Sequence, residues 1–186
     1  VTLPLLPSPN QQVRTTWQGT PRPSLASAGM SPRPEQPLPI WLGVGGTPRS
    51  AARAGFLGLP MNLAILGGPA RFVPFVQIFR RAAEQAGQAS PPLAISSHGH
   101  IADDGNVARD EHWALYGPMM RKGLRNRFPG VNITREQYDQ EAGPTGAMFV
   151  GDAKEIIAKL RWEHSLFGHQ RTLLQLDWGG LPYEKV

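Results

Sequence analysis

The chain has 186 residues, of which 40% are hydrophobic and 18% are charged, and this is enough for one globular domain with a sizeable core. It contains no cysteine, which excludes disulfides, thiolate metal sites and cysteine nucleophiles. No apolar run reaches the length of a membrane span, and no signal-peptide pattern opens the chain. We therefore expect a cytoplasmic protein that does not bind membranes.

The net charge of +5 and the pI of about 10.1 raise the question of nucleic-acid binding. The arginines are scattered, however, and the densest basic group spans only residues 121–127. A solvated helix face explains this group, and no zinc-finger or RNP-type motif accompanies it. We expect no nucleic-acid partner.

The first 39 residues are rich in proline, with nine of the 19 prolines of the chain. Proline fixes φ and removes a hydrogen-bond donor, so this segment is predicted to be mostly extended loop without a core of its own. Residues 13–17 are predicted to pair as an edge strand. The predicted organisation is a lead-in over residues 1–39, followed by one domain over residues 40–186.

From residue 40 onward, short apolar runs alternate with helical patterns. Strands are predicted at 40–44, 61–66, 93–101 and 172–176, with a brief extended piece at 148–151. Helices are predicted at 47–55, 69–86, 107–127, 134–141 and 152–167, the last two with Thr134/Gln137 and Asp152/Glu155 capping boxes. This alternation predicts parallel βα units, either a small open sheet or half of a (β/α)8 barrel.

Several ordered segments carry a resemblance to a known family. They are residues 37–55 (PLPIWLGVGGTPRSAARAG), 58–61, 65–72, 97–103 (SHGHIAD), 146–151, 173–176 and 181–185. In sequence and order these segments resemble the C-terminal half of luciferase-like monooxygenases, flavin-dependent oxidoreductases that fold as TIM barrels. The resemblance implies an α/β fold in which this chain supplies about strands five to eight of the barrel. The start at Val1 and the end soon after a strand likewise predict a fragment of a domain.

The segment Val44–Ser50 joins a strand to a helix that begins at Thr47-Pro48. Glycines allow a close backbone approach, and a helix N-terminus offers N–H groups to an anion. The resemblance implies that this turn contacts the flavin phosphate, with Gly45, Gly46, Thr47 and Ser50 as cofactor-binding residues. The other interpretation is a tight turn and a good helix start.

Ser96, His98 and His100 alternate on the predicted strand 93–101 and therefore share one face. If that face lines the barrel mouth, His98 is the candidate catalytic residue and His100 a candidate for the substrate pocket. Two histidines also suggest a metal pair, but no third ligand is evident, so no metal is expected. The sequence favours a hydrogen-bonded structural role for these histidines over a functional one.

The remaining residues of interest stand at strand ends or on helices. Asp177 and Trp178 follow the last predicted strand, at the catalytic end of such a barrel, and are candidates for the substrate pocket. Asp103 and Asp104 are predicted to cap the following helix. A final group is expected to face solvent from helices: Glu111, His112, Glu163 and His164.

The resemblance implies a monooxygenase that uses reduced flavin and O2 on a small organic substrate. The cofactor is FMN or, in some branches, a deazaflavin, and a flavin reductase and a second copy of the chain are candidate partners. The alternative is a non-catalytic remnant or subunit that binds little or no flavin, because half a barrel leaves strand edges open. A sugar-phosphate isomerase or lyase would need a lysine or acid at a strand end, where Asp177 is the one candidate.

Overall fold

The computed structural model describes residues 14–20, 23–29, 31–127, 132–177 and 180–185. The chain divides into two compact units, Val1–Trp41 and Leu42–Val186. The boundary predicted from the proline content lay after residue 39. Within the described ranges, no helix combines the length and the apolar character that crossing a membrane requires.

The first unit holds two short antiparallel strands, β1 (Arg14–Trp17) and β2 (Leu25–Gly29). The predicted strand 13–17 is confirmed from Arg14 onward, and Val13 lies outside the described residues. Strand β2 was not predicted, because its small residues show no apolar alternation and its conformation depends on pairing with β1. Thr15 is the one buried side chain among the described residues of this unit.

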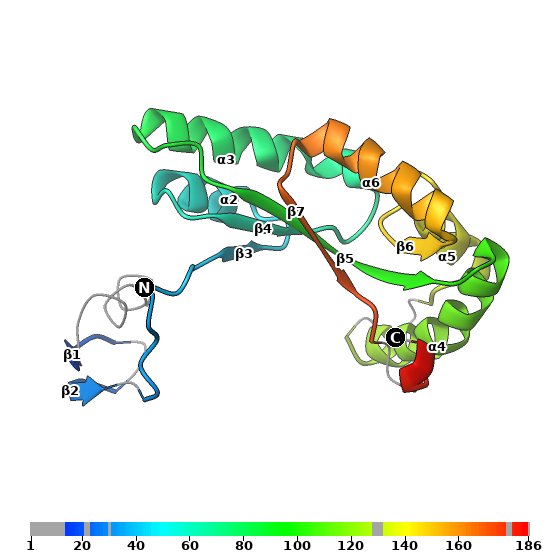
Figure 1. Ribbon diagram of the computed structural model, residues 1–186, viewed down its shortest axis with the longest axis horizontal. Helices are drawn as coiled ribbons and strands as arrows, with labels where there is room; N and C mark the ends of the chain where they lie inside the picture. The colour runs from blue at the N-terminus through cyan, green and yellow to red at the C-terminus, as the bar shows by residue number, and fades with distance from the viewer. Residues whose placement is uncertain (1–13, 21–22, 30, 128–131, 178–179, 186) are drawn as a thin grey trace. The chain divides into compact units, whose positions relative to one another are not determined.

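The second unit is built on a parallel sheet (Figure 1). Strands β3 (Leu42–Val44), β4 (Met61–Ala64) and β5 (Leu93–Ile101) lie side by side in that order. On the other side of β5, strand β7 (Arg171–Gln175) pairs with its first part and β6 (Phe149–Gly151) with its last three residues. The predicted parallel βα architecture is therefore confirmed, and the long β5 is its centre.

Three helices pack against the same face of this sheet: α2 (Pro48–Phe56), α3 (Val73–Gln85) and α6 (Ala153–Phe167). Their apolar residues form one core with Leu63 of β4 and Ile95 of β5. Successive strand residues point to opposite faces, so Ser96 and His98 point away from this core. The face that carries the candidate site is thus the one without these three helices.

A second, smaller core lies near the carboxyl end of β5. It joins α4 (Gly105–Arg127), α5 (Arg135–Ala142) and β6. Helix α4 begins two residues earlier than predicted because the carboxylate of Asp104 accepts hydrogen bonds from the N–H groups of Asn106 and Val107. It continues through Pro118 despite the missing donor of that residue. Both predicted capping boxes are confirmed.

The predicted helix 69–86 is corrected at its start. Residues Pro69–Phe72 form the 3-10 helix η2, and α3 begins only at Val73. Pro74 explains the change, because it lacks an N–H group and its ring excludes a regular α-helical turn before it. A proline is tolerated in the first turn of an α-helix, where Pro74 now lies.

Candidate functional site

The turn between β3 and α2 has the geometry of an open cradle. Gly46 has a φ of +106°, a left-handed conformation that favours glycine. Thr47 is the N-cap residue of α2, as predicted, but its hydroxyl makes no capping hydrogen bond. Gly45 and Thr47 are exposed, and Gly46 and Ser50 are half-buried.

The donors at this turn suit a phosphate group. The hydroxyls of Thr47 and Ser50 and the first N–H groups of α2 lie at the positive end of the helix dipole. No acidic residue occupies the first turn of α2, so the helix itself places no carboxylate beside an anion bound at its N-terminus. A Cβ atom on Gly45 would meet nothing within 4 Å, which shows that the backbone of the turn is open to an approaching ligand.

A hollow of about 300 Å³ lies on the sheet face that is not covered by α2, α3 and α6. His98 lines it, together with residues of β4, β5, β7 and the segment after β4: Ala64, Leu66, Ser96, Ser97, Leu173, Leu174 and Gln175. Burial lowers the pKa of His98 below its ordinary value, which favours the neutral imidazole. The structure thus places His98 in a cavity formed by three neighbouring strands.

His100 lies one step further along the same strand face, but not in that hollow. It is only 2% exposed, and its Nε2 lies 2.9 Å from Oε2 of Glu111 on α4. The other carboxylate oxygen of Glu111 accepts a hydrogen bond from Lys185 in the 3-10 helix η3 (Tyr183–Lys185). The structure therefore gives His100 a hydrogen-bonded position between β5 and α4.

The prediction that His112 and Glu163 face solvent is wrong, since they are 1% and 0% exposed, and Glu111 is half-buried. Nδ1 of His112 lies 3.0 Å from the Tyr138 hydroxyl, which donates to the carbonyl of Arg109. Burial, with smaller effects from His100 and His98, lowers the pKa of His112 to about 3. His164 is exposed, as predicted.

A helical spacing in the sequence could have revealed this buried cluster. Ala108, His112 and Tyr116 recur every four residues on α4 and are all buried. The rings of His112 and Tyr116 lie near that of His98 on β5: the ring centroid of Tyr116 lies 6.3 Å from that of His98 and 5.2 Å from that of His112. Histidine and tyrosine have polar groups, so a search for apolar residues at helical spacing passes over such a buried helix face.

The remaining candidates lie after β7. Asp177 is exposed in the segment that follows the strand, and Trp178 lies outside the described residues. No cluster of three metal-ligating side chains occurs in the described part of the chain. The structure brings together the histidines of β5 and the aromatic residues of α4. It does not bring the β3–α2 turn into the lining of the His98 hollow.

Three comparisons with known proteins bear on this geometry. The sequence matches the family described as luciferase-like monooxygenase over residues 8–170. The search of curated proteins returned no match.

Solved structures share the fold at low identity. Monooxygenase RslO1 from Streptomyces bottropensis matches with a TM-score of 0.68 and 23% identity, over 95% of this chain and 53% of that one. The oxygenating constituent of 3,6-diketocamphane monooxygenase from Pseudomonas putida, in complex with FMN, matches with a TM-score of 0.60 and 17% identity, over 84% of this chain and 46% of that one. The coenzyme F420 dependent tetrahydromethanopterin reductase from Methanopyrus kandleri matches with a TM-score of 0.56 and 16% identity, over 81% of this chain and 49% of that one.

The chain spans about half the length of these structures. The parallel βα units of the chain and the fold of these solved structures confirm the predicted α/β class. Both agree with part of a luciferase-like barrel. The family match covers most of the sequence. The chain belongs to the luciferase-like monooxygenase family.

Proposed function

We propose that this chain is the phosphate-binding half of a flavin-dependent oxidoreductase, a monooxygenase that acts with reduced flavin and O2 on a small organic substrate. The observation that carries the proposal is the turn between β3 and α2, where Gly46 has a positive φ and the Thr47 hydroxyl makes no capping bond. Glycine backbone and helix N–H groups in this arrangement bind phosphate in many proteins.

The reduced flavin would supply the electrons that activate O2, and the protein would position and shield it. In this division of work, Gly45, Gly46, Thr47 and Ser50 hold the phosphate. His98 lines a hollow at the carboxyl end of the strands, where enzymes of this barrel type bind their substrates. His98 is therefore proposed to contact the flavin ring or the substrate as a neutral hydrogen-bonding group.

The cofactor is FMN or a deazaflavin. Support comes from the fold relatives, one of which is described in complex with FMN and another as dependent on coenzyme F420. A flavin reductase is the proposed supplier of reduced flavin. His100, Asp177 and Trp178 remain proposed contributors to the substrate pocket, and the cytoplasm remains the proposed location.

Titration of FMN with the purified chain, followed by quenching of flavin fluorescence, tests the proposal. We expect quenching that saturates, and about tenfold weaker binding in Thr47→Ala and in Ser50→Ala, since each change removes one hydrogen bond to a charged phosphate. Ser165→Ala, on the distant helix α6, is the matched control. A well-folded chain that fails to quench FMN would favour the alternative, a non-catalytic subunit or remnant.

A further inference from the structure

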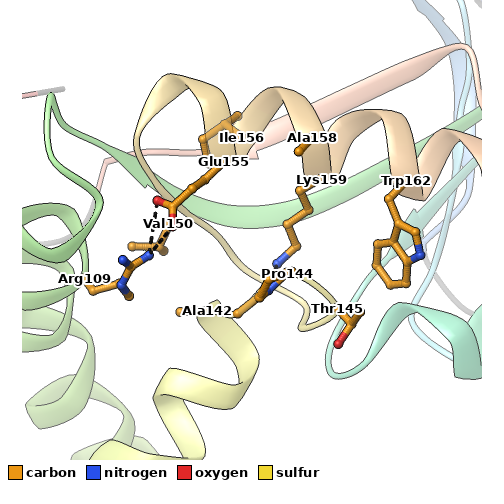
Figure 2. Close-up of a pocket in the computed structure, with 11 residues that line it drawn as sticks. Arg109, Ala142, Pro144, Thr145, Val150, Glu155, Ile156, Ala158, Lys159 and Trp162 are labelled. Atoms are coloured by element: carbon orange, nitrogen blue, oxygen red, sulfur yellow. Dashed lines mark hydrogen bonds and ion pairs between the residues drawn. The ribbon is translucent and has the colours of Figure 1, made fainter.

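A second cavity, of about 380 Å³, lies between α4, α6 and the segment that joins α5 to β6 (Figure 2). It is within the size range of small-molecule sites, about 300–1,000 Å³. No residue is shared between its lining and that of the His98 hollow. None of its lining residues belongs to β3 or β7.

The wall of this cavity is mainly apolar. Ala142 is the last residue of α5, and Pro144 lies in the α5–β6 segment. Val150 comes from β6, and Ile156 and Trp162 come from α6. Figure 2 shows Lys159 and Trp162 projecting from α6 toward the segment that carries Pro144 and Thr145. An apolar wall of this kind suits the hydrocarbon or aromatic body of a small ligand.

Lys159 is the unusual member of the lining, because it is only 5% exposed. Its Nζ donates to the carbonyls of Gly143, at 2.8 Å, and Met148, at 2.5 Å. An ammonium group has three N–H donors, so these two carbonyls leave one donor for a further acceptor. A buried charge is costly unless it is paired and fully hydrogen-bonded, and a ligand anion would meet both needs.

The charges around Lys159 come from three helices. In the cavity lining, Arg109 of α4 and Lys159 of α6 are cationic and Glu155 is anionic, which leaves one net positive charge. Glu155 is held by Arg109 at 3.1 Å. Glu141 of α5 accepts from the N–H of Ala147, and Glu163 of α6 is buried one turn beyond Lys159.

We propose that this cavity binds a small organic anion, a carboxylate with an apolar body, whose head group accepts the remaining hydrogen bond of Lys159. The site lies apart from the proposed flavin site, and its occupation does not depend on flavin chemistry. The aromatic or branched body of the ligand packs between Trp162, Ile156 and Pro144.

The pH dependence of this binding follows from the groups already named. Burial lowers the pKa of Lys159 to about 8, against the smaller opposing effect of Glu163 and Glu141. Burial also raises the pKa of Glu163 to about 7, against the effect of Lys159. As the pH falls, Lys159 becomes fully charged and Glu163 loses its charge, so an anion binds more tightly at about pH 6.5 than at about pH 8.5.

The test compares benzoate with its neutral isostere benzamide, by isothermal titration calorimetry on the full chain at constant ionic strength. We expect benzoate to bind about tenfold more tightly than benzamide at about pH 6.5. Lys159→Met removes this preference, and Lys154→Met, an exposed lysine on the same helix, keeps it. Ala158→Phe fills the cavity from an exposed position and abolishes binding while the helix remains intact.

Three results would overturn the proposal. The first is the absence of benzoate binding by a folded chain, and the second is equal binding of benzoate and benzamide. The third is unchanged benzoate binding in Ala158→Phe, which decides the matter even if Lys159→Met does not fold. Since the two sites share no residue, the outcome of the FMN titration does not affect these results.

Discussion

Glu163 is a buried carboxyl group whose two oxygens have no hydrogen-bond partner among the described residues. Burial raises its pKa from 4.5 to about 7. The folded chain therefore holds a proton that the unfolded chain releases, and the free energy of unfolding falls as the pH rises from about 4.5 to about 7. Above that range the cost of the buried charge is on the order of 3 kcal/mol.

Glu163→Gln removes this cost, so we expect the variant to be more stable than the wild type at about pH 8 and to gain little at about pH 4.5. Urea unfolding at the two pH values measures the difference. Glu84→Gln, at an exposed position of α3, is the control and should change neither midpoint. An equal gain at both pH values would show that charge burial is not the cause.

Tyr138 ties α5 to α4 through its buried hydroxyl, which donates to the carbonyl of Arg109 and lies 3.0 Å from Nδ1 of His112. Tyr138→Phe leaves both groups without this partner, and we expect a loss of about 1–3 kcal/mol in the free energy of unfolding. Tyr183→Phe, at a residue that is 91% exposed, should have no effect. Equal stability of the two variants would contradict the described contact.

At the scale of elements, the packing of α2 on α3 depends on Gly55. A Cβ atom at this position would lie 2.1 Å from the carbonyl oxygen of Phe79 and 2.9 Å from the N atom of Ala83. The two helices would have to move apart. Gly55→Ala is therefore expected to lower the free energy of unfolding by about 2 kcal/mol or more, although alanine favours helices.

Gly123→Ala on α4 is the matched comparison, since nothing lies within 4 Å of the added Cβ. At this position only helix propensity changes, and we expect the free energy of unfolding to rise by up to about 1 kcal/mol. Thermal unfolding of both variants provides the measurement. A gain in both would mean that α2 and α3 do not pack closely at Gly55.

The elements differ in how far the sequence could predict them. Strand β5 was predicted with its exact ends, and α5 and α6 with their caps, because periodicity and capping residues are local signals. Strand β2 has no such signal, since its conformation depends on pairing with β1. The burial of His112, Lys159 and Glu163 arises from packing between distant segments. Their polar and charged side chains would by themselves predict exposure to solvent.

The candidate site also has one part that local sequence predicts and another that depends on distant segments. The turn at Gly46 and Thr47 could be predicted from its glycines and from Thr-Pro, which act locally. The hollow at His98 could not, because it requires β7 to lie beside β5 across about 75 intervening residues, as in the pairing of Ser96 with Leu173. The second cavity, which Lys159 lines, also combines three distant segments, and no sequence motif predicts it.

At the scale of the whole molecule, β3, β6 and β7 each pair with only one other strand among the described residues. Leu173 of β7 is 42% exposed, and Leu66 after β4 is 61% exposed. Open strand edges and exposed leucines favour association. We expect the isolated chain to form homo-oligomers whose mass rises with concentration, as measured by size-exclusion chromatography with light scattering.

Leu173→Lys places a charge on the outer strand, so it should shift this equilibrium toward the monomer. The exposed Ile157 on α6 offers a control, since Ile157→Lys adds the same charge away from the sheet edges. A chain that stays monomeric at all concentrations would contradict the expectation. Equal effects of the two variants would place the interface elsewhere.

The measurement that most directly tests the central claim is the affinity of the chain for FMN relative to riboflavin, which lacks only the phosphate. If the turn at Gly46, Thr47 and Ser50 holds that phosphate, FMN should bind at least about tenfold more tightly, and the difference should shrink as salt is added. Equal affinity for the two flavins, or an FMN preference that survives Thr47→Ala combined with Ser50→Ala, would contradict the phosphate site.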